Sequence, residues 1–236
     1  MVRAVDYGES DRVVTLLTQG IGKIGALARG ARKSRKRFGA ALMPFVLGEA
    51  DLRERRADLY VLERFDAVRD FTAVSADVAK VAHAAYLTEL VREMTPERSP
   101  EPPVFSLYAE ALGLLCEFPA RAELLRAFEL RLLAALGLLP SLSRCAGCGG
   151  DDVGDQFDPG RGGMLCRGCA PGPFTLGRPA REALLRMEGL SFPDAAAHGL
   201  SADANAQARA ALIGFIEHHL GRGLRSPGFI AELSRR

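Results

Sequence analysis

The sequence predicts an α+β chain of more than one domain, in which a small β-barrel precedes a larger helical domain. Short runs rich in Val and Leu, separated by glycines or charged turns, fill the first seventy residues, and such runs are typical of strands. From Ser75 onward apolar residues instead recur at helical spacing. Two CxxC pairs in the helical part predict an inserted metal knuckle. We place the barrel at 1–72, the helical domain at 73–236 and the knuckle at 143–172.

Four runs in the N-terminal domain have the composition of strands. They are "RVVTLL" (12–17), "IGALARG" (24–30), "ALMPFVLGEADL" (41–52) and "LYVLERFDAV" (59–68). The segment "TQGIGKIG" supplies a Gly-rich turn between the first two. Pro44 lies inside the third run and has no N–H to donate, so that strand should be an edge, a bulge or a bend. Short strands at this spacing suggest a closed or partly closed barrel.

The helical domain contains five stretches of helical periodicity. They are "SADVAKVAHAAYLTELVREM" (75–94), "VFSLYAEALGLLCEF" (104–118), "ARAELLRAFELRLLAALG" (120–137), "RPAREALLRMEG" (178–189) and "SADANAQARAALIGFIEHHLG" (201–221). Ser75 and Ser201 are the expected N-caps of the first and last. Pro102 and Pro103 can open the second helix, and Gly137 should end the third.

Four of the five cysteines form two tight pairs in "CAGCGGDDVGDQFDPGRGGMLCRGC". This spacing predicts a structural Zn²⁺ held by four thiolates: Cys145, Cys148, Cys166 and Cys169. Two disulfides are the alternative, but the N-terminus shows no secretion signal. A catalytic zinc is disfavoured because four thiolates leave no open position. The acidic loop between the pairs favours a fold staple or a protein-docking surface over a phosphate contact.

The most unusual stretch is basic. Residues 12–48 hold eight of the 31 basic residues and none of the 29 acidic ones, so the rest of the chain is acidic. Such a block between apolar strands predicts phosphate binding, although a solvated loop or a protective charge cluster on an edge strand would also fit. The expected contacts are Arg12, Lys23, Arg29, Arg32, Lys33, Arg35, Lys36 and Arg37. Candidate base-stacking aromatics are Phe38 and Phe45, followed by Tyr60 and Phe65, although each is more often a core residue than a stacking platform.

Other classes of function find little support. No run approaches the ~20 apolar residues of a membrane span, and a basic amphipathic helix suited to a membrane surface is not evident. Neither clustered acids for Mg²⁺ nor a nucleophilic lysine motif is visible, so we do not expect an enzyme. Glu9 and Asp11 are interpreted as turn and cap residues, and His218 and His219 as structural residues near a helix end. We expect a cytoplasmic protein.

Several of these stretches together resemble the bacterial RecO family. The resemblance rests on "DYGESDRVVTLLTQGIGKIGALARGARKSRKRFGAALMPF", on "LTELVREMTPE" followed by "VFSLYAEAL", and on "FELRLLAALGLLPSLSRCAGCG". It extends from near the N-terminus through Cys169. Family members usually have a first strand ahead of "DYGESD", whereas only "MVRAV" precedes it here. Either the start is misassigned or the first barrel strand is short, and either would leave an open edge of the sheet.

The resemblance implies a recombination mediator of DNA repair. It implies an N-terminal OB-fold whose basic surface contacts DNA, mapped here onto Arg29, Arg32, Lys33, Arg35, Lys36 and Arg37. Such proteins bind single- and double-stranded DNA and anneal complementary strands. With RecR, and in many bacteria with RecF, they load RecA onto strands coated by single-stranded DNA-binding protein. The implied protein is nucleoid-associated, uses no nucleotide cofactor and is not an enzyme.

Two other functions fit the same residues. A zinc-stabilised OB-fold protein that binds RNA would need the same barrel and charge, and competition between matched RNA and DNA would separate it from a DNA-binding protein. A protein-docking adaptor would use the helical domain, and this function overlaps with the first because a mediator must also bind other proteins.

Overall fold

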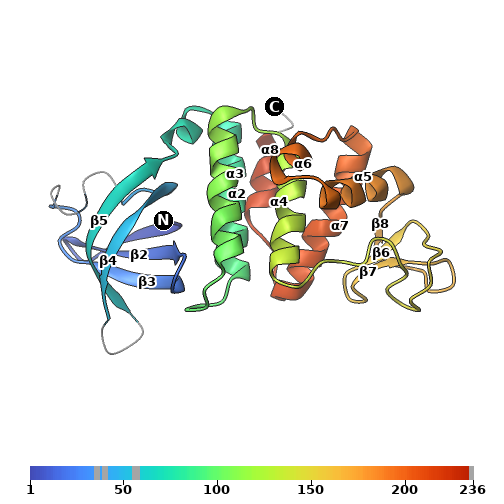
Figure 1. Cartoon of the computed structure of the whole chain (residues 1–236), viewed down its shortest axis with the longest axis horizontal. Coiled ribbons are helices and arrows are strands. Elements are labelled where there is room, and N and C mark those ends of the chain that lie inside the picture. The colour runs from blue at the N-terminus through green and yellow to red at the C-terminus, as the bar shows by residue number, and fades with distance from the viewer. Residues whose placement is uncertain (35–37, 39–41, 55–58, 234–236) are drawn as a thin grey trace. The chain divides into compact units, whose positions relative to one another are not determined.

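The computed structural model describes residues 1–34, 38, 42–54 and 59–233. It contains two compact units, the first built mainly of Met1–Pro119 and the second of Ala120–Glu232. The first unit holds a five-stranded sheet and two long helices, and the second holds the remaining helices and the four cysteines (Figure 1). The prediction of an α+β chain with a β-sheet domain before a helical one is confirmed. The predicted boundary at 72/73 falls just after the last strand of the sheet and stays a prediction.

The sheet has the strand order β1-β2-β3-β5-β4. Its strands are β1 (Arg3–Tyr7), β2 (Asp11–Thr18), β3 (Gly22–Ala28), β4 (Val46–Arg53) and β5 (Tyr60–Asp70). Strands β3 and β5 pair in parallel, and the other neighbours are antiparallel. The edge strands β1 and β4 approach at one end, where the Met1 ammonium donates to the Val46 carbonyl at 2.7 Å. This is the partly open barrel predicted from the strand spacing, with the features of an OB-fold.

Alternating side chains form the core of the barrel. Along β2, Val14 and Leu16 point inward and are buried, whereas Val13 and Thr15 on the other face are half-buried. Ile24 and Ala26 of β3 continue the same core. This alternation is expected for a strand with one face on the core. The odd-numbered residues of β2 and β3 therefore lie on the outer face.

Two irregularities of the sheet agree with the sequence. Strand β1 is only five residues long yet pairs with β2 along its whole length, which matches the expectation of a short first strand. Strand β4 is an edge strand that begins after Pro44, and Phe45 adopts a positive φ of 63°. The chain therefore bends at the proline before it enters the sheet.

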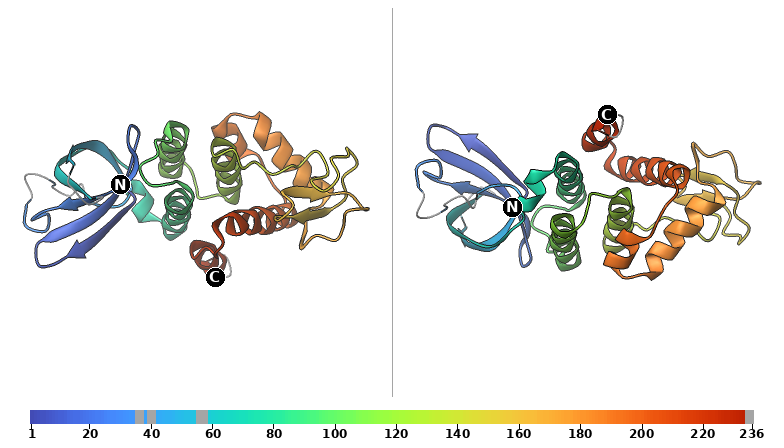
Figure 2. Two further views of the ribbon diagram at one scale, coloured as in Figure 1. Left: turned by 90° about the horizontal axis from the view of Figure 1, so that it is seen from below. Right: turned by 90° about the horizontal axis from the view of Figure 1, so that it is seen from above.

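Two helices lie side by side in the first unit (Figure 2). They are α2 (Val78–Met94) and α3 (Pro102–Glu117), preceded by the short 3-10 helix η1 (Thr72–Ala76). Pro102 and Pro103 open α3 as predicted. The predicted N-cap Ser75 is wrong, because Ser75 lies inside η1. Asp77 caps α2 instead, and its carboxylate accepts from the Ala79 N–H at 2.7 Å.

In the second unit, α4 (Ala122–Ala135) packs against α5 (Arg178–Gly189), α6 (Phe192–Ala197) and α7 (Ala202–Leu220), and α8 (Ser226–Leu233) follows α7 in the chain. Gly137 ends α4 with a left-handed φ of 71°, and Ser201 caps α7, both as predicted. A three-stranded sheet in the order β7-β6-β8 was not predicted. It comprises β6 (Gln156–Asp158), β7 (Gly163–Leu165) and β8 (Phe174–Thr175).

Candidate nucleic-acid interface and metal centre

The described part of the basic segment is an exposed loop that leaves β3 and carries Arg29, Arg32 and Lys33. Backbone hydrogen bonds fix it to the β1–β2 turn. The Arg32 N–H donates to the Ser10 carbonyl at 3.0 Å, and the Gly30 N–H donates to the Asp11 carboxylate at 2.8 Å. The cations are thus presented from a folded platform. The predicted contacts Arg35, Lys36 and Arg37 lie outside the described residues.

Asp11 is the anchor of this loop. Its carboxylate accepts hydrogen bonds from the Gly30 N–H and the Ser10 hydroxyl, and Arg29 is close enough to act on it electrostatically. The Gly30 bond contributes most to lowering the pKa of Asp11 below its usual value. A carboxylate hydrogen-bonded in its charged form stays ionised, so the anchor persists throughout the neutral range. This agrees with the interpretation of Asp11 as a turn and cap residue.

One carboxylate is shared by two of the predicted contacts. Asp6 accepts from Nε of Arg12 at 2.9 Å and lies 3.7 Å from Nε of Arg32. All three side chains are at least 30% exposed, and exposed pairs of this kind contribute only about 0–1 kcal/mol. Even with Asp6, Glu9 and Asp11 included, residues 6–37 carry five more positive than negative side chains. Asp6 therefore moderates the charge of Arg12 and Arg32, while the segment keeps a positive excess in its sequence.

Lys23 has a different environment from the other predicted contacts. Its side chain is buried, and its ammonium donates to the carbonyls of Arg92 and Thr95, the latter at 2.7 Å. Glu97 lies 3.4 Å away. Lys23 thus satisfies carbonyls at the C-terminal end of α2, where a cation is favoured, and it ties that helix to β3. We leave it out of the proposed interface.

Replacing Lys23 with Met is expected to destabilise the protein without weakening nucleic-acid binding. The methionine keeps most of the volume but leaves two buried carbonyls without their charged donor, which costs about 1–3 kcal/mol. Chemical denaturation measures the loss, and DNA affinity per folded molecule should stay within about twofold of wild type. A large loss of DNA affinity in a folded Lys23→Met protein would mean that Lys23 is part of the interface.

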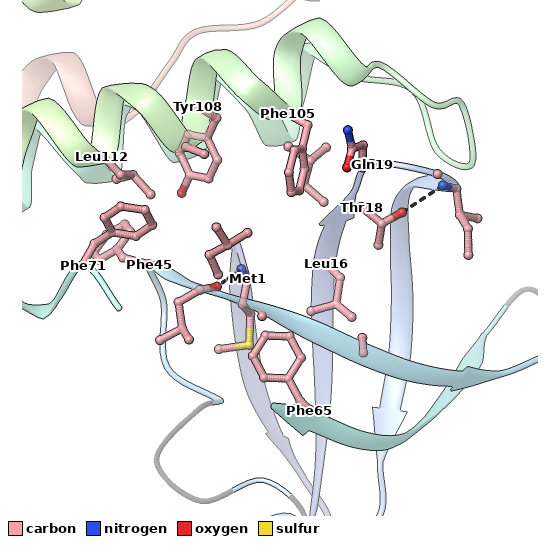
Figure 3. Close-up of a pocket in the computed structure, with 18 of the residues that line it drawn as sticks. Met1, Leu16, Thr18, Gln19, Phe45, Phe65, Phe71, Phe105, Tyr108 and Leu112 are labelled. Atoms are coloured by element: carbon pink, nitrogen blue, oxygen red, sulfur yellow. Dashed lines mark hydrogen bonds between the residues drawn. The ribbon is translucent and has the colours of Figure 1, made fainter. Parts of the chain in front are cut away.

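The aromatics predicted as candidate stackers do not lie on the cationic surface. Phe38 and Phe65 are 2% and 5% exposed and belong to the barrel core. Phe45 lines an apolar cavity of about 390 Å³, in which Phe105 and Tyr108 of α3 face residues of the sheet (Figure 3). Tyr60 packs against the barrel core and lies beneath the Arg98 guanidinium, 5.4 Å from it. The four aromatics are therefore buried or half-buried, in line with the expectation that each is more often core. Sequence reasoning missed Tyr7, which is 61% exposed at the end of β1.

The second candidate site is formed by Cys145, Cys148, Cys166 and Cys169, whose sulfurs all lie within 4.8 Å of one another. Among the described residues, no other group of three or more ligand-type side chains could hold a metal ion. The Cys148 and Cys166 sulfurs are 3.8 Å apart, and a tetrahedral zinc with bonds of ~2.3 Å needs sulfur–sulfur edges of about 3.8 Å. The four cysteines could therefore hold one metal ion, and the donor set suits Zn²⁺.

The backbone around the sulfurs is adapted to this cluster. A Cβ on Gly147 would lie 2.9 Å from the Cys169 sulfur, and Gly149 has a φ of 77° that favours glycine. The Cys166 N–H donates to the Cys145 sulfur at 3.2 Å, and this bond, together with those from Cys148 and Gly147, lowers the pKa of that thiol to about 6. Hydrogen bonding with the other three thiols raises the pKa of Cys169 to about 12, and the thiol of Cys166 makes the largest contribution. A cation at the centre of the four sulfurs would offset this effect, because it favours the thiolate form of every ligand.

The knuckle is joined to the helices through its small sheet. Phe157 of β6 makes an edge contact with Phe215 of α7, with ring centroids 5.9 Å apart. Phe174 of β8 lies so close to α7 that a Cβ on Gly214 would be 2.3 Å from its ring. Asp151 and Arg144 form an exposed pair on the outer loop. The cluster therefore holds together a segment that also covers α7.

Partly open five-stranded barrels of this kind belong to the class of oligonucleotide- and oligosaccharide-binding folds, here followed by helices and a four-cysteine cluster. Residues 1–71 match the family pattern "Recombination protein O N terminal", and residues 75–228 match "Recombination protein O C terminal". "DNA repair protein RecO" of Anaeromyxobacter dehalogenans (strain 2CP-C) is 49% identical, with 99% of this chain and 94% of the relative covered. The proteins of the same name from Myxococcus xanthus and Symbiobacterium thermophilum are 39% and 36% identical, with 99% of this chain and 95% of each relative covered.

The chain belongs to the RecO family of DNA repair proteins. The family resemblance predicted from the sequence is confirmed. RecO proteins are mediators rather than enzymes, so the family also supports the prediction of a non-enzymatic chain. Among the described residues, no helix has both the length and the apolar character that crossing a bilayer requires.

Proposed function

We propose that this protein is a DNA-binding recombination mediator. It binds single- and double-stranded DNA through backbone phosphates and anneals complementary strands. With RecR, and with RecF where that protein is present, it helps to load RecA onto DNA coated by single-stranded DNA-binding protein. The observation that carries the proposal is the loop of Arg29, Arg32 and Lys33, exposed on a barrel and fastened to the β1–β2 turn. Family membership supports DNA repair as the biological setting, and the proposed location is the bacterial cytoplasm.

The electrostatics explain why such a surface promotes annealing. Two strands repel each other because each carries a negative phosphate per nucleotide. Cations that contact both strands lower this repulsion and release condensed counterions. Arginine and lysine side chains on a loop outside a groove contact phosphates without reading bases, so the binding should be indifferent to sequence.

The affinity for DNA is expected to fall steeply with salt. Four to six phosphate contacts predict a slope of log K against log salt between about −3 and −5. Fluorescence anisotropy with oligonucleotides of scrambled sequence measures both the slope and the indifference to sequence, and a matched RNA competitor tests the rival RNA-binding function. A flat salt dependence would overturn the proposal.

We also propose that Zn²⁺ is the ion held by Cys145, Cys148, Cys166 and Cys169, and that it is structural. Four thiolates complete a tetrahedron and leave no position for a substrate. The loop between the cysteine pairs carries Asp151, Asp152, Asp155 and Asp158 against Arg161, so the site is unsuited to phosphate. Its proposed role is to fix the knuckle against α7 and to leave an acidic surface available to protein partners.

A further inference from the structure

The outer face of strands β1 to β3 carries an unusual apolar strip. Because side chains alternate along a strand, Ala4 packs into the barrel core while Val5 and Tyr7 point outward, 44% and 61% exposed. Val5 lies opposite Val13 of β2, and Val13 lies opposite Leu27 of β3. Both partners are half-buried. Three neighbouring strands thus present aliphatic side chains to solvent, with the Tyr7 ring at one end.

That end of the strip is where the basic loop is fastened. Gly8 follows Tyr7 with a left-handed φ of 59°, and the carbonyls of the turn that it opens accept hydrogen bonds from the loop. The Glu9 carbonyl accepts from the Arg32 guanidinium at 3.3 Å, and the Ser10 carbonyl accepts from the Arg32 N–H. The aromatic ring and the cations are therefore held at the same end of the barrel by one turn.

The register places Tyr7 beside the loop on the outer face as well. Its cross-strand partner is Asp11, the residue that anchors Gly30 and is influenced by Arg29. Arg3, two residues before Val5 on the same face, is also exposed. Arg29 and Arg3 thus lie toward the two ends of the strip, whereas Arg32 pairs with Asp6 on the other face of β1. A chain whose phosphates follow Arg29 and Arg3 would pass its bases over Tyr7 and Val5.

We propose that Tyr7 is a base-stacking residue that gives this surface a preference for single-stranded over duplex DNA. The inference rests on the proposed function, in which the basic loop binds phosphates. In a duplex the bases stay stacked on one another, so an aromatic ring on the protein can reach only the phosphate backbone. A single strand can turn a base onto the ring, and any base will do because every base has an aromatic face. Val5 and Val13 form the apolar floor beside the stacked base.

A tryptophan reporter tests the contact directly. The chain contains no tryptophan, so a Tyr7→Trp variant has one tryptophan, at the proposed site, and it can be excited apart from the remaining tyrosines. Saturating oligo(dT) should quench its emission strongly, because a base stacks on the indole. The matched control is Phe118→Trp, which places the fluorophore at an exposed position after α3 in the same unit and should be little changed. Equal quenching of both reporters, or none in Tyr7→Trp, would overturn the proposal.

Affinity measurements separate this inference from the proposed function. Tyr7→Ala should weaken single-strand binding by about 5- to 150-fold, the range of base–aromatic stacking, and should leave duplex binding within about twofold. Tyr7→Phe should retain wild-type behaviour, and Val68→Ala, which removes an exposed side chain from β5, should change neither affinity. If neutralising the basic loop weakens binding but Tyr7→Ala does not, the stacking role is wrong and the mediator function stands. If neither change has an effect, both proposals fail.

Discussion

Replacing Arg29, Arg32 and Lys33 together with glutamine is expected to weaken DNA binding by about 10²- to 10³-fold at 0.1 M salt and to abolish strand annealing. Each phosphate contact contributes about 0.7–0.9 to the slope of log K against log salt. Loss of three contacts should therefore reduce that slope by about 2 to 3. The difference between variant and wild type should narrow as salt rises toward 1 M, because the lost contribution is that of counterion release. Anisotropy titrations over a range of salt measure this, and annealing of complementary oligonucleotides gives the functional readout.

The matched control removes the same number of charges from the same unit. Arg53, Arg64 and Arg69 are exposed on β4 and β5, and each forms an ion pair, with Glu63, Asp66 and Glu117 respectively. Their replacement with glutamine should change affinity severalfold at most. A second triple variant, with Arg35, Lys36 and Arg37 replaced by glutamine, tests the rest of the predicted segment. Equal losses in the loop variant and the control would mean that net charge, rather than this loop, determines binding.

Removing the metal ion is expected to unfold the second unit while the first remains folded. Structural zinc in small domains contributes an apparent 10–16 kcal/mol, which is comparable to the 5–15 kcal/mol total stability of a typical domain. The effect should spread from the knuckle because Phe157 and Phe174 pack against α7. A chelator or a Cys148→Ser substitution should abolish stoichiometric zinc in metal analysis and reduce the helical circular dichroism signal.

The control for this experiment is Cys116→Ser. Cys116 lies on α3 in the first unit and is not one of the four clustered cysteines, so its replacement should leave one zinc per chain and an unchanged melting temperature. DNA affinity of the Cys148→Ser protein should stay within about twofold of wild type, because the proposed interface lies in the first unit. Full helicity and an unaltered melting temperature in Cys148→Ser would contradict a structural role for the metal.

Most of the fold could be predicted because local chemistry determines it. Pro102 opens α3, Gly137 ends α4 and Ser201 caps α7, each through a backbone preference that one residue carries. The start of α2 could not be predicted as well, since Ser75 and Asp77 are both good caps and only the preceding 3-10 turn selects Asp77. The strands β6 to β8 have two or three residues each, too few for a visible period.

The candidate sites were predictable to different degrees. The metal cluster depends on a fixed spacing of one residue type, so the sequence is sufficient to identify it. The basic segment is visible as composition, but its members differ in ways that only the fold determines. Lys23 is buried because the end of α2 covers it, and no local pattern signals that long-range contact. Tyr7 was overlooked because its strand is short, although the alternation of Val5 and Tyr7 before Gly8 was available as a signal.

In the proposed function, the sharing of Asp6 between Arg12 and Arg32 has a consequence for release of the annealed product. An incoming phosphate must displace this carboxylate, and the carboxylate returns when the phosphate leaves. An internal competitor of this kind limits residence time, because the departing strand does not leave bare cations behind. A protein that anneals two strands and then releases the duplex benefits more from rapid dissociation than from the highest affinity.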